Sequence, residues 1–166
     1  MSVKPAPHNT FVIEVKLRAE FNDPEGLAAL SLLREQGLTS LKDIRVGRLY
    51  ELTGPLSNNQ SQQIGKDILC DAVTQEYRLV TPVPSPMNGM NCWRVEVWLK
   101  PSVSDPVGET VIEAAVESGF PRPSSARCAL FYRLSGRCVK PQIEKAVAKS
   151  LANPLIHNII VTEAHP

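Results

Sequence analysis

The chain has 166 residues, 43% of them hydrophobic, and its 18 Lys and Arg nearly balance 17 Asp and Glu. This balance lacks the basic excess of proteins that bind nucleic acid or an anionic membrane surface. The first residues lack the apolar core of a signal peptide, and no apolar run approaches about 18 residues, the length of a membrane span. We therefore expect a cytoplasmic protein with no nucleic-acid or membrane partner.

The first half of the chain predicts the element order β-α-β-α-β. Residues 11–18 alternate apolar and charged side chains, which is typical of a half-buried strand, with Glu14, Lys16 and Arg18 facing outward. Asp23 and Pro24 then suit the N-cap and first position of a helix that Gly37 ends. A strand over 41–52, a helix capped by Ser57 or Asn58 and a strand over 77–80 complete the unit. The spacing of Leu27, Leu30, Ser31 and Leu33 indicates the first helix.

The second half repeats the first 82 positions later without a gap. About fourteen identities fall over roughly seventy positions, a period that is a duplicated domain rather than a solenoid repeat. The repeat predicts strands at 93–99, 126–134 and 158–161, and helices that start at Asp105-Pro106 and Pro141. Gly26 and its copy Gly108 lie in the first turn of a helix, where they indicate a close approach of backbone, either to a strand or to a ligand.

These elements predict an α+β fold in which helices cover one face of an antiparallel sheet. A domain of about 80 residues buries too little surface to be very stable alone, so we expect the halves to share a core as a pseudo-twofold pair. We place the first domain at 9–82, a stiff Pro-rich connector at 83–91 and the second domain at 92–164.

The sequence shows no convergent catalytic, cofactor-binding or metal-ligating set. The histidines His8, His157 and His165 lack metal-binding spacing, and the nucleotide-binding and nucleophile-elbow motifs are absent. The capping role accounts for Asp23 and Asp105. The cysteines at 70, 92, 128 and 138 suit small reduced thiols better than a disulfide or a metal site.

Three residues are candidates for a partner interface. Arg45 and Arg127 are the only cationic residues identical in the two copies. Each is either a solvated strand residue or a fork that binds a carboxylate or phosphate, and the sequence leaves both open. Trp98 lies on the outward, charged face of its predicted strand, so it is either a contact surface or covered by the other half of the chain.

Several strings resemble the PurS family, the small subunit of phosphoribosylformylglycinamidine (FGAM) synthase in de novo purine biosynthesis. The second half carries V-E-V-x-L-K-P-x-V-x-D-P-x-G-E from Val95 to Glu109 and N-P-L-I from Asn153 to Ile156. The first half carries related versions in 13–18, 23–26, 44–47 and 68–77. The two resemblances cover nearly the whole chain apart from its ends and connector, so it resembles a tandem of two PurS-like, ferredoxin-like-related domains.

The resemblance implies an assembly role. In the family, the synthetase PurL binds ATP and substrate, the glutaminase PurQ releases ammonia, and PurS bridges them without catalysing a reaction. The resemblance therefore implies a subunit of a glutamine-dependent, ATP-driven C–N ligase complex that holds no cofactor of its own. Single-domain members are about half this length and self-associate, so a tandem chain would supply their dimer internally; further pairing as a homodimer is left open. Asp71-Ala72 in place of Asn153-Pro154 indicates that the copies have diverged.

The sequence also offers two alternative functions. Residues 23–30 are similar to the helix start of ACT-like amino-acid sensors, which bind an effector at the first strand-to-helix turn, near the helix N-terminus. The direct Asp23-Pro24 spacing and the Asn153-Pro154 ending favour PurS instead. A stand-alone enzyme is the least favoured, because no catalytic set converges.

Overall fold

The computed structural model describes residues 8–80 and 91–163. The predicted connector at 83–91 lies outside these residues except for Asn91. In chain order the elements are β1 (Asn9–Leu17), α1 (Pro24–Glu35), β2 (Leu41–Gly54), α2 (Asn58–Ile64) with a π-helical turn (Gly65–Leu69), β3 (Gln75–Val80), β4 (Cys92–Leu99), α3 (Pro106–Glu117), β5 (Ser125–Gly136), α4 (Lys140–Ser150) and β6 (His157–Glu163). Each predicted strand and helix is present, and the ends of most strands extend a few residues further than predicted.

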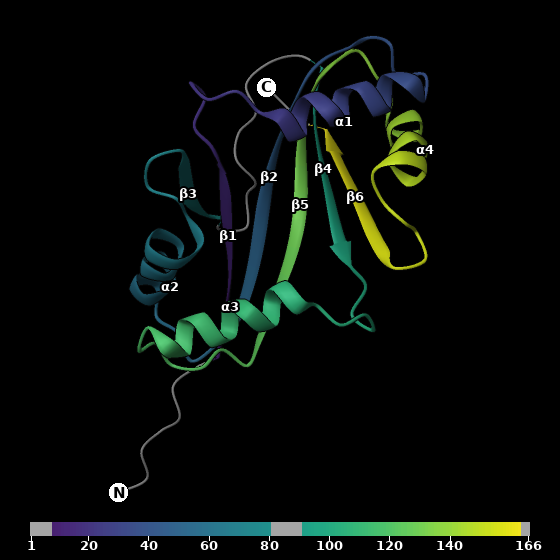
Figure 1. Ribbon diagram of the computed structural model, residues 1–166. Coiled ribbons are helices and arrows are strands. Elements are labelled where there is room, and N and C mark those ends of the chain that lie inside the picture. The colour runs from purple at the N-terminus through teal and green to yellow at the C-terminus, as the bar shows by residue number, and fades with distance from the viewer. Residues whose placement is uncertain (1–7, 81–90, 164–166) are drawn as a thin grey trace, which may run out of the picture.

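The strands form one six-stranded sheet in the order β3-β1-β2-β5-β4-β6, and every neighbouring pair is antiparallel. The order is symmetric about its centre, because β2 and β5 are copies of one another, as are β1 and β4, and β3 and β6. The helices α1, α3 and α4 lie across one face of this sheet, and α2 packs beside β1 and β3 (Figure 1). The predicted α+β fold, with two β-α-β-α-β halves in one antiparallel sheet, is confirmed.

The strand registers show a pseudo-twofold axis. Ile13 pairs with Tyr50 in the first half, and the copies Val95 and Tyr132 pair in the second. At the centre of the sheet, Arg48 pairs with Leu130, and these two are themselves equivalent positions of the repeat. The axis therefore passes between β2 and β5 at this pair, so the two halves join as a dimer would.

The core is shared between the halves, as their small size predicts. One buried cluster joins Leu33 of α1 to Ile143 and Val147 of α4, over β2, β5, β4 and β6. A second cluster joins Ile64 of α2 to Val111 and Ala115 of α3. In both clusters a helix from one half packs with a helix from the other. Burial of apolar surface contributes about 25 cal/mol per Å². The surface that is buried between the halves therefore stabilises both of them together.

In each half, the turn at the start of the first helix attaches that helix to the sheet. These two turns, at Asp23 and Asp105, are called the corners below. The Asp23 carboxylate accepts hydrogen bonds from the N–H groups of Gly26 (2.9 Å) and Val46 (2.7 Å). The Asp105 carboxylate does the same with Gly108 (2.9 Å) and Cys128 (2.8 Å). Each aspartate thus caps its helix and fixes it to the neighbouring central strand.

The glycines at these corners explain a feature of the sequence. A Cβ on Gly26 would collide with the carbonyl oxygen of Ile44, and one on Gly108 with that of Ala126. The predicted close approach is therefore to a strand of the same half rather than to a ligand. Only a residue without a side chain lets the helix lie this near the sheet.

The buried face of α1 includes only two of the four residues whose spacing predicted this helix. Leu27 is 63% exposed and Ser31 is exposed, whereas the buried positions are Gly26, Ala29, Leu30 and Leu33. These positions follow the i, i+3, i+4, i+7 spacing of one helix face. The contact of Gly26 with the sheet sets the rotation of the helix, and this rotation turns Leu27 toward solvent.

Candidate interaction surface on the open face of the sheet

The sheet face opposite the helices, called the open face below, has its own apolar cluster. Leu49, Trp98, Ala129 and Phe131 are buried there, and Val12 packs against them. All five are strand residues, and within the described part of the chain no helix contributes to this cluster. Trp98 points outward as predicted but is only 8% exposed, since Leu49 and Val12 of the first half cover it. Cover by the other half, one of the two predicted alternatives, is what is observed.

A buried ion pair crosses the open face, although the alternating pattern of β1 predicts an outward position for Glu14. Glu14 of β1 and Arg94 of β4 are 1% and 4% exposed, and their charged groups lie 3.1 Å apart. The Arg94 guanidinium also lies over the Phe131 ring, 4.4 Å from its centroid. A Cβ on Gly47 would collide with that ring. The absence of a side chain at Gly47 therefore leaves room for the Phe131 ring between β1 and β4.

Arg45 and Arg127 take equivalent positions and both bind backbone. Arg45 donates to the carbonyl oxygens of Phe21 (2.8 Å) and Arg18 (3.1 Å), which follow β1. Arg127 donates to Leu99 O (3.0 Å), at the end of β4. Both arginines therefore hold the turn between the first strand and the first helix of their half. Their role at a partner interface stays a prediction.

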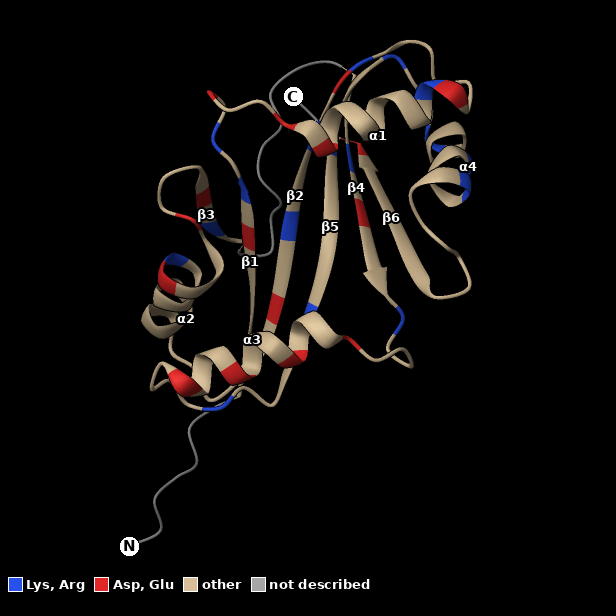
Figure 2. Cartoon of the chain, viewed as in Figure 1, with Lys and Arg blue, Asp and Glu red and all other residues tan. Residues whose placement is uncertain are grey.

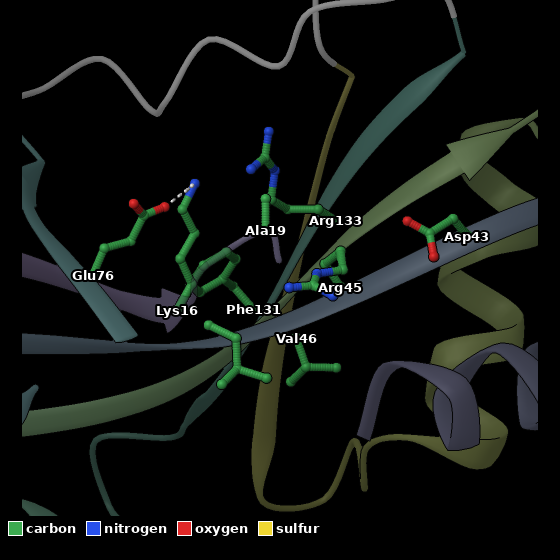
Figure 3. Close-up of a pocket in the computed structure, with 9 residues that line it drawn as sticks. Lys16, Ala19, Asp43, Arg45, Val46, Glu76, Phe131 and Arg133 are labelled. Carbon is green, nitrogen blue, oxygen red and sulfur yellow. Dashed lines mark ion pairs between the residues drawn. The ribbon is translucent and has the colours of Figure 1, made fainter. Parts of the chain in front are cut away.

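Two related recesses flank the apolar cluster. The basic recess, a hollow of about 370 Å³, contains Lys16, Arg45 and Arg133, with Glu76 and Asp43 at its edge (Figure 3). The mixed recess, about 430 Å³, contains their copies Trp98, Arg127 and Glu51, together with Arg94, Glu96 and Ile160. In the mixed recess Arg127 lies 3.6 Å from Glu51 and 5.3 Å from the centroid of the Trp98 ring. Equivalent hollows thus have different chemistry.

The helix layer is also asymmetric in charge. Figure 2 shows acidic residues along α3 and basic residues along α4. The acidic residues are Glu109, Glu113 and Glu117, and the basic ones are Lys140, Lys145 and Lys149. All six are exposed, so α3 and α4, which both belong to the second half, present opposite charges to solvent.

Cys70, Cys128 and Cys138 are free thiols, and the pKa of Cys128 is shifted furthest among them. Burial raises the pKa of its thiol from 9.0 to about 12, and the nearby Asp105 carboxylate adds to the rise. Burial likewise raises the pKa of the thiols of Cys70 and Cys138. At neutral pH these groups are protonated thiols, which are poor nucleophiles and poor metal ligands. The described residues contain no group of three or more His, Cys, Asp or Glu placed to hold a metal ion.

Sequence reasoning missed Glu14, Arg94 and Arg133 as members of this surface. The repeat contained a signal for Arg133, because its equivalent is Glu51, a reversal of charge between the copies. The register of β2 against β5 was needed to see that Arg133 lies directly opposite Arg45.

Comparison with known proteins agrees with this tandem architecture. The family model for PurS, phosphoribosylformylglycinamidine (FGAM) synthase, matches twice, at residues 10–82 and 92–164. The chain belongs to the PurS family. It is also 30% identical over 70 residues to the phosphoribosylformylglycinamidine synthase subunit PurS of Mycobacterium leprae (strain TN). That alignment covers 89% of the relative but 41% of this chain, consistent with two PurS-like units here for one there. No described helix has the length and apolar character needed to cross a bilayer.

Proposed function

We propose that this chain is the non-catalytic assembly subunit of a cytoplasmic FGAM synthase, bridging the ATP-dependent synthetase PurL and the glutaminase PurQ. The observation that carries the proposal is the double match to the PurS family, with both copies in one pseudo-symmetric sheet. The internal pairing of β2 with β5 replaces an association of two separate chains.

The asymmetry of the molecule supports a bridging role. A bridge between two different proteins needs two different surfaces, whereas a symmetric dimer of identical units offers the same surface twice. Here the basic and mixed recesses occupy equivalent sites with different residues. Each partner would therefore meet a surface of distinct chemistry.

The polar groups that catalysis would draw on have structural roles. The carboxylates of Asp23 and Asp105 each accept two backbone hydrogen bonds. The thiol of Cys128 is protonated at neutral pH because its pKa is about 12. These assignments support a chain that organises the complex and leaves the chemistry to its partners.

Co-purification with the synthetase and glutaminase subunits of the same organism tests the proposal. We expect a complex of all three proteins, and FGAM formation from glutamine that requires this chain. With ammonia as the nitrogen donor, the synthetase should depend on the chain much less, because ammonia need not be passed between subunits. Failure of the chain to bind either subunit would contradict the proposal.

A thermal-shift screen separates this role from amino-acid sensing. A ligand at 100 times its dissociation constant stabilises a protein by about 2.7 kcal/mol, which raises the melting temperature measurably. We expect no saturable shift with any free amino acid, because the α1 N-terminus is already capped by Asp23. The partner subunits should produce the shift instead.

A further inference from the structure

Three arginines lie side by side on the open face. The register places Arg45 of β2 directly opposite Arg133 of β5, and Arg133 directly opposite Arg94 of β4. Directly opposed residues of antiparallel strands project from the same face, and like charges at such positions destabilise a sheet. Lys16 adds a fourth cation at the basic recess (Figure 3). The row therefore has an electrostatic cost in the folded chain.

The carboxylates nearby do not compensate the whole row. Arg94 pairs with Glu14, and Lys16 lies 3.6 Å from Glu76. Arg45 is satisfied by two carbonyl oxygens, which carry no full charge. Arg133 makes no ion pair or hydrogen bond with the residues that the structure describes. It is half-buried, so its guanidinium is held at the recess while still reachable from outside.

The other half shows that the fold does not require this arrangement. At the position equivalent to Arg133 stands Glu51, which forms an ion pair with Arg127, the equivalent of Arg45. The same strand pair therefore accommodates a neutral combination of side chains. The arginine at 133 replaces an attractive cross-strand pair by a repulsive one, which points to a role outside the chain's own stability.

We propose that the basic recess is the docking site for an acidic segment of a partner subunit, with a carboxylate seated between Arg133 and Arg45. This inference rests on the proposed assembly function and specifies the chemistry of one partner. The planar guanidinium of Arg133 presents paired N–H donors that match the two oxygens of a carboxylate. The incoming negative charge relieves the repulsion between the arginines, so binding and charge compensation favour the same complex.

The substitution Arg133→Glu tests this site, because it copies Glu51 and offers Arg45 the same ion pair. We expect the melting temperature of the free chain to rise by about 1 to 4 °C. Affinity for the synthetase–glutaminase pair should fall at least about tenfold, as expected when an interfacial charge is reversed. The neutral variant Arg133→Gln should give a smaller loss of affinity in the same direction.

The variant Glu51→Arg is the matched control. It creates a second opposed arginine pair, so it should lower the melting temperature and should not reproduce the combination of higher stability and weaker binding expected of Arg133→Glu. The affinity of the wild-type chain should also fall more steeply with added salt than that of Arg133→Glu. A rise in stability together with a loss of binding is a result that a purely structural role of Arg133 would not give.

The outcomes separate the two proposals. If the wild-type chain and Arg133→Glu bind the partners equally, the docking site is wrong and the assembly function stands. If the wild-type chain binds neither partner, both proposals fall. If inorganic phosphate stabilises the wild-type chain but not Arg133→Glu, and partner affinity is the same for both, the recess is a small-anion site and the docking proposal is overturned.

Discussion

The two halves of this protein agree at the corners between helix and sheet and differ on the open face. At the corners, Asp23 and Asp105 make the same pair of backbone hydrogen bonds, with lengths that agree within 0.1 Å. On the open face, Glu51 is replaced by Arg133 and Lys16 by Trp98. The corners fix how a helix lies on a strand, so each copy needs them in order to fold. The open face is not subject to that constraint, and there the copies have acquired different chemistry.

The largest effect is expected at the buried ion pair of Glu14 and Arg94. The equivalent positions of the repeat are Glu96 and Val12, which cannot form an ion pair. The variant Arg94→Val copies Val12, the equivalent position of the first half. It leaves the Glu14 carboxylate buried without its guanidinium, so the free energy of unfolding should fall by about 3–5 kcal/mol. Urea unfolding followed by circular dichroism measures this change.

Arg127→Val is the matched control for that prediction. Its ion pair with Glu51 is about one-third exposed, so the loss should be about 1 kcal/mol. The double variant Glu14→Leu with Arg94→Val should recover most of the stability lost, because no charge then stays buried. A loss at Arg94→Val no larger than at Arg127→Val would show that burial does not distinguish the two sites.

The next effect tests whether the corners are equivalent. Gly26→Ala and Gly108→Ala each place a methyl group against a carbonyl oxygen of the neighbouring strand. We expect each to lower the free energy of unfolding by about 2–3 kcal/mol, the usual cost of overpacking. Chemical denaturation of the two variants side by side gives both values.

Gly37→Ala controls for the loss of glycine alone. Gly37 has a φ of 101° and open space around its Cα, so alanine there is strained but not obstructed, at a cost of about 1 kcal/mol. If the losses of unfolding free energy for Gly26→Ala and Gly108→Ala differ by more than the loss for Gly37→Ala, the two corners do not hold their helices equally tightly.

The smallest effect concerns Cys128, whose equivalent is Val46. Cys128→Val should change the free energy of unfolding by less than about 1.5 kcal/mol, because the volumes are similar. In the wild-type chain at pH 8, iodoacetamide should modify Cys128 at least about 100-fold more slowly than in urea, since a pKa of about 12 leaves little thiolate.

The same thiol gives a pH dependence of known sign. Its native pKa lies above the value of 9.0 expected when the chain is unfolded. Its contribution to stability is therefore complete below about pH 9 and is lost as the pH rises toward about 12. The decline should be smaller in Cys128→Val, and equal declines in the two proteins would contradict this assignment.

Local patterns in the sequence were sufficient for the elements and the duplication. Alternating side chains, the Asp-Pro helix starts and the terminal glycines act within a few residues, so periodicity and capping chemistry predicted them correctly. The repeat also predicted the shared core, because each half alone buries too little surface. The spacing of apolar residues in α1 did not predict that Leu27 is exposed, because the contact between Gly26 and a strand sets the rotation of the helix.

The open face was decided only by the tertiary structure. Glu14 and Arg94 have the pattern of outward-facing strand residues, yet they are buried and meet across two intervening strands. Arg45 and Arg133 belong to different halves, and their opposition follows from the β2–β5 register, which no local pattern encodes. The sequence by itself thus determined the units and their number. Long-range pairing of the two copies determined which charges share a face, because electrostatic partners depend on distance in space rather than along the chain.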